Sequence, residues 1–312
     1  MCDELERTCR GRKNAAMTGP MRNAPSSAFD VRQLGPSFAA EVRGCDVKAG
    51  VKNSALCADL LDLFHIYRVL VFPAQDLSPR ELLGFAHLFG EIRPHPDQRF
   101  CVPECPEVML IGNLKEGEDY HSLFVNSREE WHADLTYTAT PNKASMLYAL
   151  NVPPEGGDTM FVDMVAAYDS LSEAERTAIE GRGAVYDYVC MDAVLREHDP
   201  IRPPLLAETR RKLPPVTHPL APSHPATGRR SIYLSPEVIS HVEGMTSAES
   251  KSFVARIMAH ATQDRHVYRH RWRVGDLVLW DNRCTNHSAT TFDDARYLRL
   301  LYRCTVEGER PA

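Results

Sequence analysis

Residues 266–280 read HVYRHRWRVGDLVLW and contain two short strand-like segments, HVYRHRW and DLVLW, in close succession. Short runs rich in β-branched and aromatic residues are typical of β-strands. Further segments of this kind are spread along the chain: RVLVF, EVMLIG, SMLYAL, DTMFV, SIYLS and YLRLLYRCTV. Short strands at irregular spacing, with few helices between them, predict a mainly β fold with flanking helices, built as a sandwich or barrel.

Helix signals are fewer than strand signals. The sequence SPRE at residues 78–81 combines an N-cap serine, a proline at the first helical position and a capping-box glutamate, and apolar residues follow at helical spacing. Capping boxes of the same spacing predict two further helices, and apolar periodicity predicts a weaker one; these cover residues 172–182, 246–261 and 55–67.

Length and composition restrict the class of protein. The chain has 312 residues, of which 43% are hydrophobic and 25% are charged, so it is an ordinary globular sequence. This length allows two domains, but sandwich and barrel enzymes often use it as one. Residues 1–27 are polar without periodicity, so we expect a disordered N-terminal extension followed by a single domain over residues 28–312.

Charge, hydropathy and cysteine usage argue against nucleic-acid and membrane partners and favour the cytoplasm. Lys and Arg number 36 against 42 Asp and Glu, a net charge of −6, which argues against nucleic acid as a partner. No apolar run approaches the length of a membrane-spanning helix, and the charged N-terminus lacks the apolar segment of a signal peptide. Nine scattered cysteines, an odd number, favour reduced thiols in the cytoplasm.

The segment EEWHADLTY, residues 129–137, contains the most informative chemistry. If it forms a strand, His132 and Asp134 project from the same face, as two neighbouring metal ligands would. His287 follows the strand-like DLVLW segment and a turn-prone Asp-Asn pair, and it is the best candidate for a third ligand. Two imidazoles and one carboxylate suit iron(II) with open coordination positions, or zinc.

Two arginines near the C-terminus could meet anions. Arg299 and Arg303 lie on one face of the strand-like YLRLLYRCTV segment. If that face points inward, buried guanidinium groups require anionic partners such as carboxylates. If it points outward, the two arginines pair with acidic residues at the surface. Residue parity alone leaves both alternatives open.

Four segments together resemble a known family: EEWHADLTY, VPPEGGDTMFVDMVAAYDSLS, YRHRWRVGDLVLWDNRCTNH and the Arg299/Arg303 pair. Their order and content are similar to those of the taurine dioxygenase/2,4-dichlorophenoxyacetate dioxygenase family, which are iron(II)- and 2-oxoglutarate-dependent oxygenases. The resemblance covers roughly residues 28–310. It implies the family fold, a double-stranded β-helix or jelly roll, and it implies iron(II), 2-oxoglutarate and O2 as cofactor and cosubstrates.

The resemblance also implies roles for individual residues. His132, Asp134 and His287 would be the iron ligands, at the centre of catalysis. Thr159, in the GGDT sequence, and Arg299 would bind the distal carboxylate of 2-oxoglutarate. Arg303 would lie near the iron-bound end of 2-oxoglutarate or bind an anionic group of the substrate.

The substrate follows less directly from the sequence. His95 matches a family histidine that can contact the anionic end of the substrate. Arg128 stands four residues before His132, where taurine dioxygenases have an asparagine, which argues against taurine. Arg128, Arg296 and Arg303 together favour a carboxylate, sulfonate or phosphonate substrate.

The resemblance implies a hydroxylation that releases succinate and CO2 and that can cleave a carbon–heteroatom bond. A carboxylate at position 134 favours hydroxylation over halogenation, because related halogenases have a small residue there. Two alternatives remain at this point: the same chemistry on a natural-product intermediate, and a zinc-dependent hydrolase that uses the same three side chains. The family resemblance also suggests a homo-oligomer.

Overall fold

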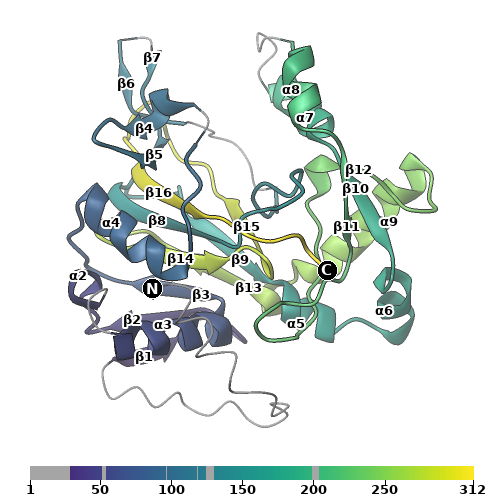
Figure 1. Cartoon of the computed structure of the whole chain (residues 1–312), viewed down its shortest axis with the longest axis horizontal. Coiled ribbons are helices and arrows are strands. Elements are labelled where there is room, and N and C mark those ends of the chain that lie inside the picture. The colour runs from purple at the N-terminus through teal and green to yellow at the C-terminus, as the bar shows by residue number, and fades with distance from the viewer. Residues whose placement is uncertain (1–28, 51–53, 96, 118, 124–129, 199–203) are drawn as a thin grey trace.

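The computed structural model describes residues 29–50, 54–95, 97–117, 119–123, 130–198 and 204–312. The extension predicted over residues 1–27 lies outside them. The largest element is an eight-stranded sheet, referred to below as the major sheet, with the strand order β1-β2-β3-β14-β8-β16-β5-β4. Figure 1 shows this sheet with helices α2, α3 and α4 on one side of the molecule and helices α5, α6 and α9 on the other.

The strands of the major sheet agree with most of the predicted segments. All neighbouring pairs are antiparallel except β2 and β3, which are parallel. The bounds are β1 Asp30–Gln33, β2 Ala40–Arg43, β3 Val69–Phe72, β4 Cys101–Val102, β5 Cys105–Gly112, β8 Ala144–Asn151, β14 Leu277–Asp281 and β16 Leu300–Val306.

Alternation along β14 shows how the major sheet separates two cores. Leu277 and Leu279 pack on its outer face, whereas Val278 and Trp280 pack on its inner face. Successive side chains of a strand point to opposite faces, and here both faces are buried, which explains why the segment has no polar alternation. The central strands β3 and β8 divide their side chains in the same way.

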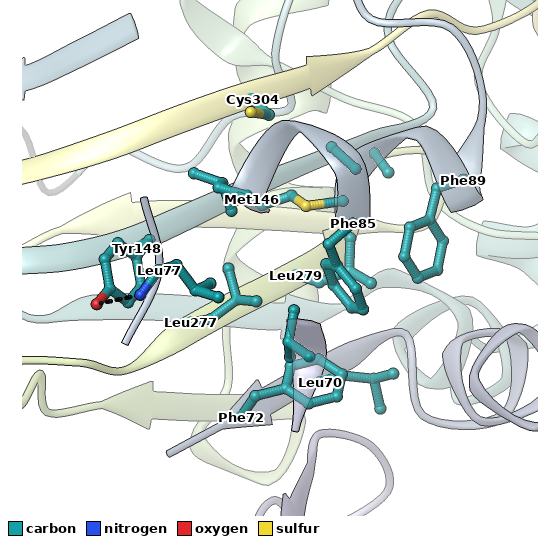
Figure 2. Packing of buried hydrophobic residues seen from close by; sticks show 14 of the residues in the cluster. Leu70, Phe72, Leu77, Phe85, Phe89, Met146, Tyr148, Leu277, Leu279 and Cys304 are labelled. Atoms are coloured by element: carbon teal, nitrogen blue, oxygen red, sulfur yellow. Dashed lines mark hydrogen bonds between the residues drawn. The ribbon is translucent and has the colours of Figure 1, made fainter. Parts of the chain in front are cut away.

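Helices cover the outer face of the major sheet. Helix α4, Pro79–Ala86, begins at the predicted N-cap: the Ser78 side chain accepts a hydrogen bond from the Glu81 backbone, and the Glu81 side chain bonds back to the Ser78 backbone. Phe85 packs against Phe72 of β3 with ring centroids 5.4 Å apart. Figure 2 shows the leucines of β14, Phe85 of α4, Phe89 just after this helix and Met146 of β8 in this outer core. The remaining elements of this layer are α2 Val47–Gly50, α3 Ser54–Tyr67 and the 3-10 turns η1 His87–Phe89 and η2 Gln98–Phe100.

A three-stranded sheet, the minor sheet, covers the inner face of the major sheet. Its order is β13-β9-β15, and all pairs are antiparallel. The bounds are β9 Thr159–Asp163, β13 Val267–His270 and β15 Thr285–Ala289. Phe161 of β9 packs between the sheets with Trp280 of β14 and Leu301 of β16. The predicted mainly β fold with flanking helices is therefore confirmed, in the form of a two-sheet sandwich.

A third layer extends the minor sheet at the side away from α3 and α4. Its sheet has the order β11-β10-β12, and its helices pack on a second core with the predicted capping boxes of α6 and α9 in place. The bounds are α5 Met164–Asp169, α6 Glu173–Ile179, β10 Gly183–Tyr186, α7 Tyr188–His198, α8 Ala207–Lys212, β11 Val216–Pro219, η3 Pro236–Val238, β12 Ile239–Val242, α9 Ser247–Ala261 and η4 Asp264–His266. A small hairpin joins β6 Lys115–Glu116 to β7 Asp119–Tyr120.

One strand prediction was wrong. The segment SIYLS, residues 231–235, is buried but forms no regular strand. Its backbone groups bond to separate partners: the Ile232 N–H donates to Met164, and the Tyr233 N–H donates to Leu220. The apolar run reflects burial between several elements and not membership of one ladder, a distinction that periodicity cannot make.

No helix among the described residues is both long enough and apolar enough to cross a membrane.

The two-faced packing of β14 predicts a large stability cost for truncating its outer face. Leu279 is 0% exposed, whereas Leu206, before α8, is 68% exposed. We expect Leu279→Ala to lower the free energy of unfolding by about 2–5 kcal/mol and Leu206→Ala by less than about 0.5 kcal/mol. Urea unfolding followed by circular dichroism measures both, and equal effects would contradict the assignment of Leu279 to the core.

Candidate active site

The first and third predicted metal ligands are joined by their backbones. The His132 N–H donates to the His287 carbonyl at 3.0 Å, and the His287 N–H donates to the His132 carbonyl at 2.8 Å. Their rings lie 4.2 Å apart between centroids. The segment around His132 was expected to be a strand, but it makes only this single bridge before a turn that includes Asp134. The bridge attaches it to β15, which carries His287.

Asp134 completes a three-residue cluster. One ligand atom from each of His132, Asp134 and His287 lies within 4.8 Å of the other two. The Asp134 Oδ1 atom lies 3.8 Å from His287 Nε2. The structure therefore brings together the three side chains that the sequence singled out, although 153 residues separate Asp134 from His287 along the chain (287 − 134 = 153).

The surroundings of Asp134 and His287 hold both side chains in the protonation states that bind metals. Burial alone would raise the pKa of Asp134, but Arg303, His287 and His132 hold that pKa well below its ordinary range. Arg303 Nη2 lies 2.6 Å from Asp134 Oδ2, to which the Ser145 hydroxyl also donates at 3.0 Å. Burial, with help from His132, lowers the pKa of His287 to about 3, so its imidazole is neutral at physiological pH. An ionised carboxylate and a neutral imidazole are the ligating forms.

Asn282 fastens Asp134 to the turn between β14 and β15. The Asn282 Oδ1 atom accepts the Asp134 N–H at 2.8 Å, and its Nδ2 donates to the Asp134 carbonyl at 3.0 Å and to the Asn142 carbonyl at 3.0 Å. The side-chain amide thus pairs with Asp134 as a neighbouring strand would. The sequence indicated that Asn282 shapes the turn before His287, but not that it also holds the second ligand.

Trp280 and Trp131 flank the cluster in different ways. The Trp280 ring lies 4.9 Å from the His287 ring between centroids, so this indole packs directly on a candidate ligand. Trp131 packs against the core of the third layer.

Thr159 lies on the same face of the minor sheet as His287. In the β15–β9 ladder His287 pairs with Phe161, and Ala289 pairs with Thr159. Paired residues, and residues two apart on one strand, share a face. Because Phe161 packs between the sheets, this shared face is the inner one.

Arg299 faces this region from the opposite sheet and is buried. Its Nε donates to the Gly157 carbonyl at 3.0 Å, and its nearest acidic neighbour, Asp158, is already bonded to Arg269 Nε at 2.7 Å. Burial lowers the pKa of Arg299 to about 10, so the guanidinium remains cationic at neutral pH. A Cβ at Gly157, whose φ is +66°, would lie 3.0 Å from the Arg299 Cδ, so glycine leaves room for this side chain.

The inward alternative for the two arginines is therefore the observed one. Leu301 of β16 packs in the inner core, and Arg303, two residues later, reaches Asp134. Arg299 is also buried, with its Nε bonded to the Gly157 carbonyl, and a guanidinium group can bind a carboxylate through two parallel hydrogen bonds.

The contacts of His95, a predicted substrate contact, lie within its own segment. Its Nδ1 lies 3.0 Å from the Asp97 carbonyl oxygen and its ring lies 6.5 Å from the Phe100 ring between centroids, contacts that are local to its own segment. Arg128 lies outside the described residues.

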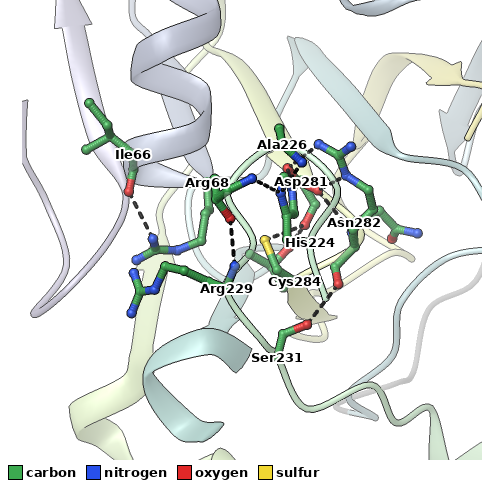
Figure 3. Close-up of polar contacts among 12 residues, drawn as sticks. Ile66, Arg68, His224, Ala226, Arg229, Ser231, Asp281, Asn282 and Cys284 are labelled. Atoms are coloured by element: carbon green, nitrogen blue, oxygen red, sulfur yellow. Dashed lines mark hydrogen bonds and ion pairs between the residues drawn. The ribbon is translucent and has the colours of Figure 1, made fainter. Parts of the chain in front are cut away.

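A second group of potential ligands lies behind the site. One ligand atom from each of His224, Asp281 and Cys284 lies within 4.8 Å of the other two. Figure 3 shows His224 beside Asp281 and Cys284. His224 Nδ1 accepts two backbone N–H groups, so its Nε2 donates to Asp281 Oδ2, at 2.9 Å. Arg283 Nε and Nη2 bond to the two Asp281 oxygens at 2.9 and 2.8 Å, and burial raises the pKa of the Cys284 thiol. Because His224 and Arg283 already bond to the Asp281 oxygens, we interpret this group as one that stabilises the turn carrying Asn282 and not as a metal site.

The cluster of His132, Asp134 and His287 fits a divalent metal. The His287 Nδ1 atom is buried and has no hydrogen-bond partner within the described part of the chain. The two ring nitrogens of His287 are therefore not both occupied by hydrogen bonds to the protein. Two neutral nitrogens and one anionic oxygen are the donors that mononuclear iron(II) sites use, and zinc accepts the same set.

A sandwich fold with such a cluster between its sheets defines the class of jelly-roll metalloenzymes. The sequence matches the family model for "Taurine catabolism dioxygenase TauD, TfdA family" over residues 30–305. The chain belongs to this family, as its sequence motifs predicted.

Individual relatives extend over most of both chains. The chain is 34% identical over 284 residues to an alpha-ketoglutarate-dependent 2,4-dichlorophenoxyacetate dioxygenase from Cupriavidus pinatubonensis, covering 88% of this chain and 96% of the relative. It is 30% identical to a pentalenolactone F synthase from Streptomyces arenae, covering 84% and 89%. The solved structure of a taurine dioxygenase from Burkholderia xenovorans superposes with a TM-score of 0.75 at 29% identity, covering 91% of each chain. The expected jelly-roll fold is thereby confirmed.

The contacts of Asn282 predict that it supports metal binding without touching the metal. We expect Asn282→Ala to weaken the binding of Mn(II), measured by calorimetry, by about tenfold to a hundredfold, because outer hydrogen bonds of this kind tune metal affinity by that amount. Asn113→Ala is a matched control, since Asn113 bonds to the backbone near Arg299 and not to Asp134. Unchanged Mn(II) affinity in Asn282→Ala would contradict the role given to this amide.

Proposed function

We propose that this protein is an iron(II)- and 2-oxoglutarate-dependent dioxygenase that hydroxylates a small, anionic organic substrate. The proposal is carried by two features of the interior: the cluster of His132, Asp134 and His287, and the buried guanidinium of Arg299, which makes no ion pair with the described carboxylates and bonds to the Gly157 carbonyl. A zinc hydrolase would need the cluster but not a second, separate site for an anion.

The three cluster residues would hold iron(II), and the ion, once bound with 2-oxoglutarate and O2, supplies the oxidising chemistry that yields succinate, CO2 and the hydroxylated product. Asp134 would occupy one coordination position, which favours hydroxylation. Its second oxygen stays bonded to Arg303 and Ser145 and fixes the carboxylate in place. Arg299 and Thr159 would bind the distal carboxylate of 2-oxoglutarate and thereby orient this cosubstrate.

Arg303 is well placed to influence the substrate. It is partly exposed, with 19% of its side chain accessible, and its Nε is buried without a partner among the described residues. A carboxylate or sulfonate near the cluster would meet this guanidinium. We therefore keep a phenoxyalkanoate-, sulfonate- or carboxylate-like substrate as the proposal, with His95 and Arg128 as further candidate contacts.

The same cofactor chemistry on a natural-product intermediate is the second candidate. The similarity to pentalenolactone F synthase, at 30% identity over most of both chains, favours it. The two candidates differ in substrate and not in the residues that bind iron and 2-oxoglutarate.

We further propose that residues 28–312 act as one catalytic domain in a cytoplasmic homo-oligomer. The family match over residues 30–305 supports a single domain. Seven free cysteines among the described residues support a reducing compartment. Light scattering on the purified protein measures the oligomeric state.

Replacement of each cluster residue tests the reaction class. We expect His132→Ala, Asp134→Ala and His287→Ala to reduce succinate formation from 2-oxoglutarate to background, because each removes one of three protein ligands. His241→Ala, on β12, is the matched control and should retain activity. The wild-type assay, run over a panel of small anions with and without O2, separates the alternatives: turnover that needs no O2 and gives no succinate would indicate the hydrolase.

Replacement of Arg299 tests the anion site. We expect Arg299→Ala to raise the KM for 2-oxoglutarate by at least about tenfold, since a charge-assisted bidentate bond is lost, with a smaller effect on kcat. Arg256→Ala removes a surface arginine that pairs with Glu175, and should leave both constants unchanged. A KM that does not respond to Arg299→Ala would remove Arg299 from the proposed site.

A further inference from the structure

The indole of Trp272 is bonded to the hydroxyl of Thr159. Trp272 Nε1 lies 3.0 Å from Thr159 Oγ1, and both residues are buried. An indole N–H can only donate, so Thr159 Oγ1 is the acceptor in this bond. The direction of the bond is therefore fixed by chemistry and does not depend on an assumed hydrogen position.

This direction leaves the Thr159 proton free to be donated elsewhere. A hydroxyl has one proton and two acceptor positions, and Trp272 occupies one of the latter. Among the described residues the bond from Trp272 is the hydrogen bond that the Thr159 hydroxyl makes, so its proton has no protein acceptor there. Arg299 Nε donates to the carbonyl of Gly157, two residues before Thr159. The cationic guanidinium of Arg299 and the hydroxyl of Thr159 therefore lie next to the same turn.

The Trp272 ring is itself held in place. It packs between the two sheets with Phe161 and Leu301. Its ring meets the His270 ring at 89°, with centroids 4.5 Å apart. His270 is in turn held by the Tyr268 hydroxyl, which lies 3.1 Å from its Nδ1. The indole N–H therefore has little freedom to leave Thr159.

We propose that Trp272 is a positioning residue that fixes the polarity of the Thr159 hydroxyl, so that Thr159 donates to the distal carboxylate of bound 2-oxoglutarate. The inference rests on the proposed function, because it takes 2-oxoglutarate as the ligand of Arg299 and Thr159. It adds a residue that touches neither metal nor cosubstrate and acts through Thr159 alone. Without the indole, the hydroxyl rotates freely and must be ordered when the ligand binds.

A double-mutant cycle on the full-length protein tests the proposal. The dissociation constant of 2-oxoglutarate is measured by calorimetry on Mn(II)-loaded protein without O2, so that binding is observed without turnover. We expect Thr159→Val to raise this constant by about tenfold to a hundredfold and Trp272→Phe by about threefold to tenfold. In the Thr159→Val background, Trp272→Phe should change it by less than about 1.5-fold, because the hydroxyl through which the indole acts is gone.

The outcomes separate this inference from the proposed function. If wild-type protein binds Mn(II) but not 2-oxoglutarate, the proposed function fails. If wild-type protein binds 2-oxoglutarate but Trp272→Phe weakens binding equally with and without the Thr159 hydroxyl, the indole only packs, and the inference alone is wrong. Thr159→Ser keeps the hydroxyl, so in that background the effect of Trp272→Phe should return.

A second measurement keeps the proposal testable if Trp272→Phe does not fold. The chain has three tryptophans, so the indole N–H signals of the Zn(II)-loaded protein can be resolved by NMR. A hydroxyl that donates to a carboxylate becomes a stronger acceptor. Addition of 2-oxoglutarate should therefore move the Trp272 indole proton downfield in wild-type protein and not in Thr159→Val. A Trp272 signal that stays fixed while 2-oxoglutarate binds overturns the inference.

Discussion

The pair of backbone hydrogen bonds between His132 and His287 is the constraint on which the candidate site depends. Each residue donates to and accepts from the other, so the two imidazoles leave their backbones from one fixed pair of neighbouring positions. The segment that carries His132 and Asp134 makes no further ladder with the minor sheet in the described structure. The single bridge, with the amide of Asn282 on Asp134, therefore sets the spacing of all three candidate ligands.

Among the described residues, Arg299 is a buried cation without a paired carboxylate, separate from the cluster. Asp134 is balanced by Arg303, and Asp158 is balanced by Arg269. The guanidinium of Arg299 is left with a backbone carbonyl as its bonded partner. Burying a cation without an anion is unfavourable, and a bound dicarboxylate such as 2-oxoglutarate would supply the missing charge. The unpaired guanidinium of Arg299 thus lowers the stability of the free protein, and a bound dicarboxylate would restore that stability.

The site is supported from behind by groups that never reach the metal cluster. The hydrogen bond from His224 to Asp281 and the ion pair between Arg283 and Asp281 stabilise the turn from which Asn282 projects. The Arg68 carbonyl accepts the Asp281 N–H, and the Arg68 guanidinium pairs with the buried Asp163. Asp163 in turn caps helix α5 at the end of β9. These contacts make the ends of β9, β14 and β15 rigid, which is what a site that must orient small groups requires.

The sequence by itself indicated the class of fold, the His132/Asp134 pair and the starts of α4, α6 and α9, because each depends on local chemistry: β-branched runs, a His-x-Asp spacing and Ser or Thr capping boxes. The assignment of His287 as the third ligand followed from the family resemblance. Tertiary structure alone decided which face of β16 points inward, since both parities of YLRLLYRCTV are compatible with burial. It also decided the roles of Asn282 and Trp272, whose partners lie 148 and 113 residues away along the chain. Hydrogen bonds between such distant residues leave no periodic signal, and only the packing of one sheet on the other creates them.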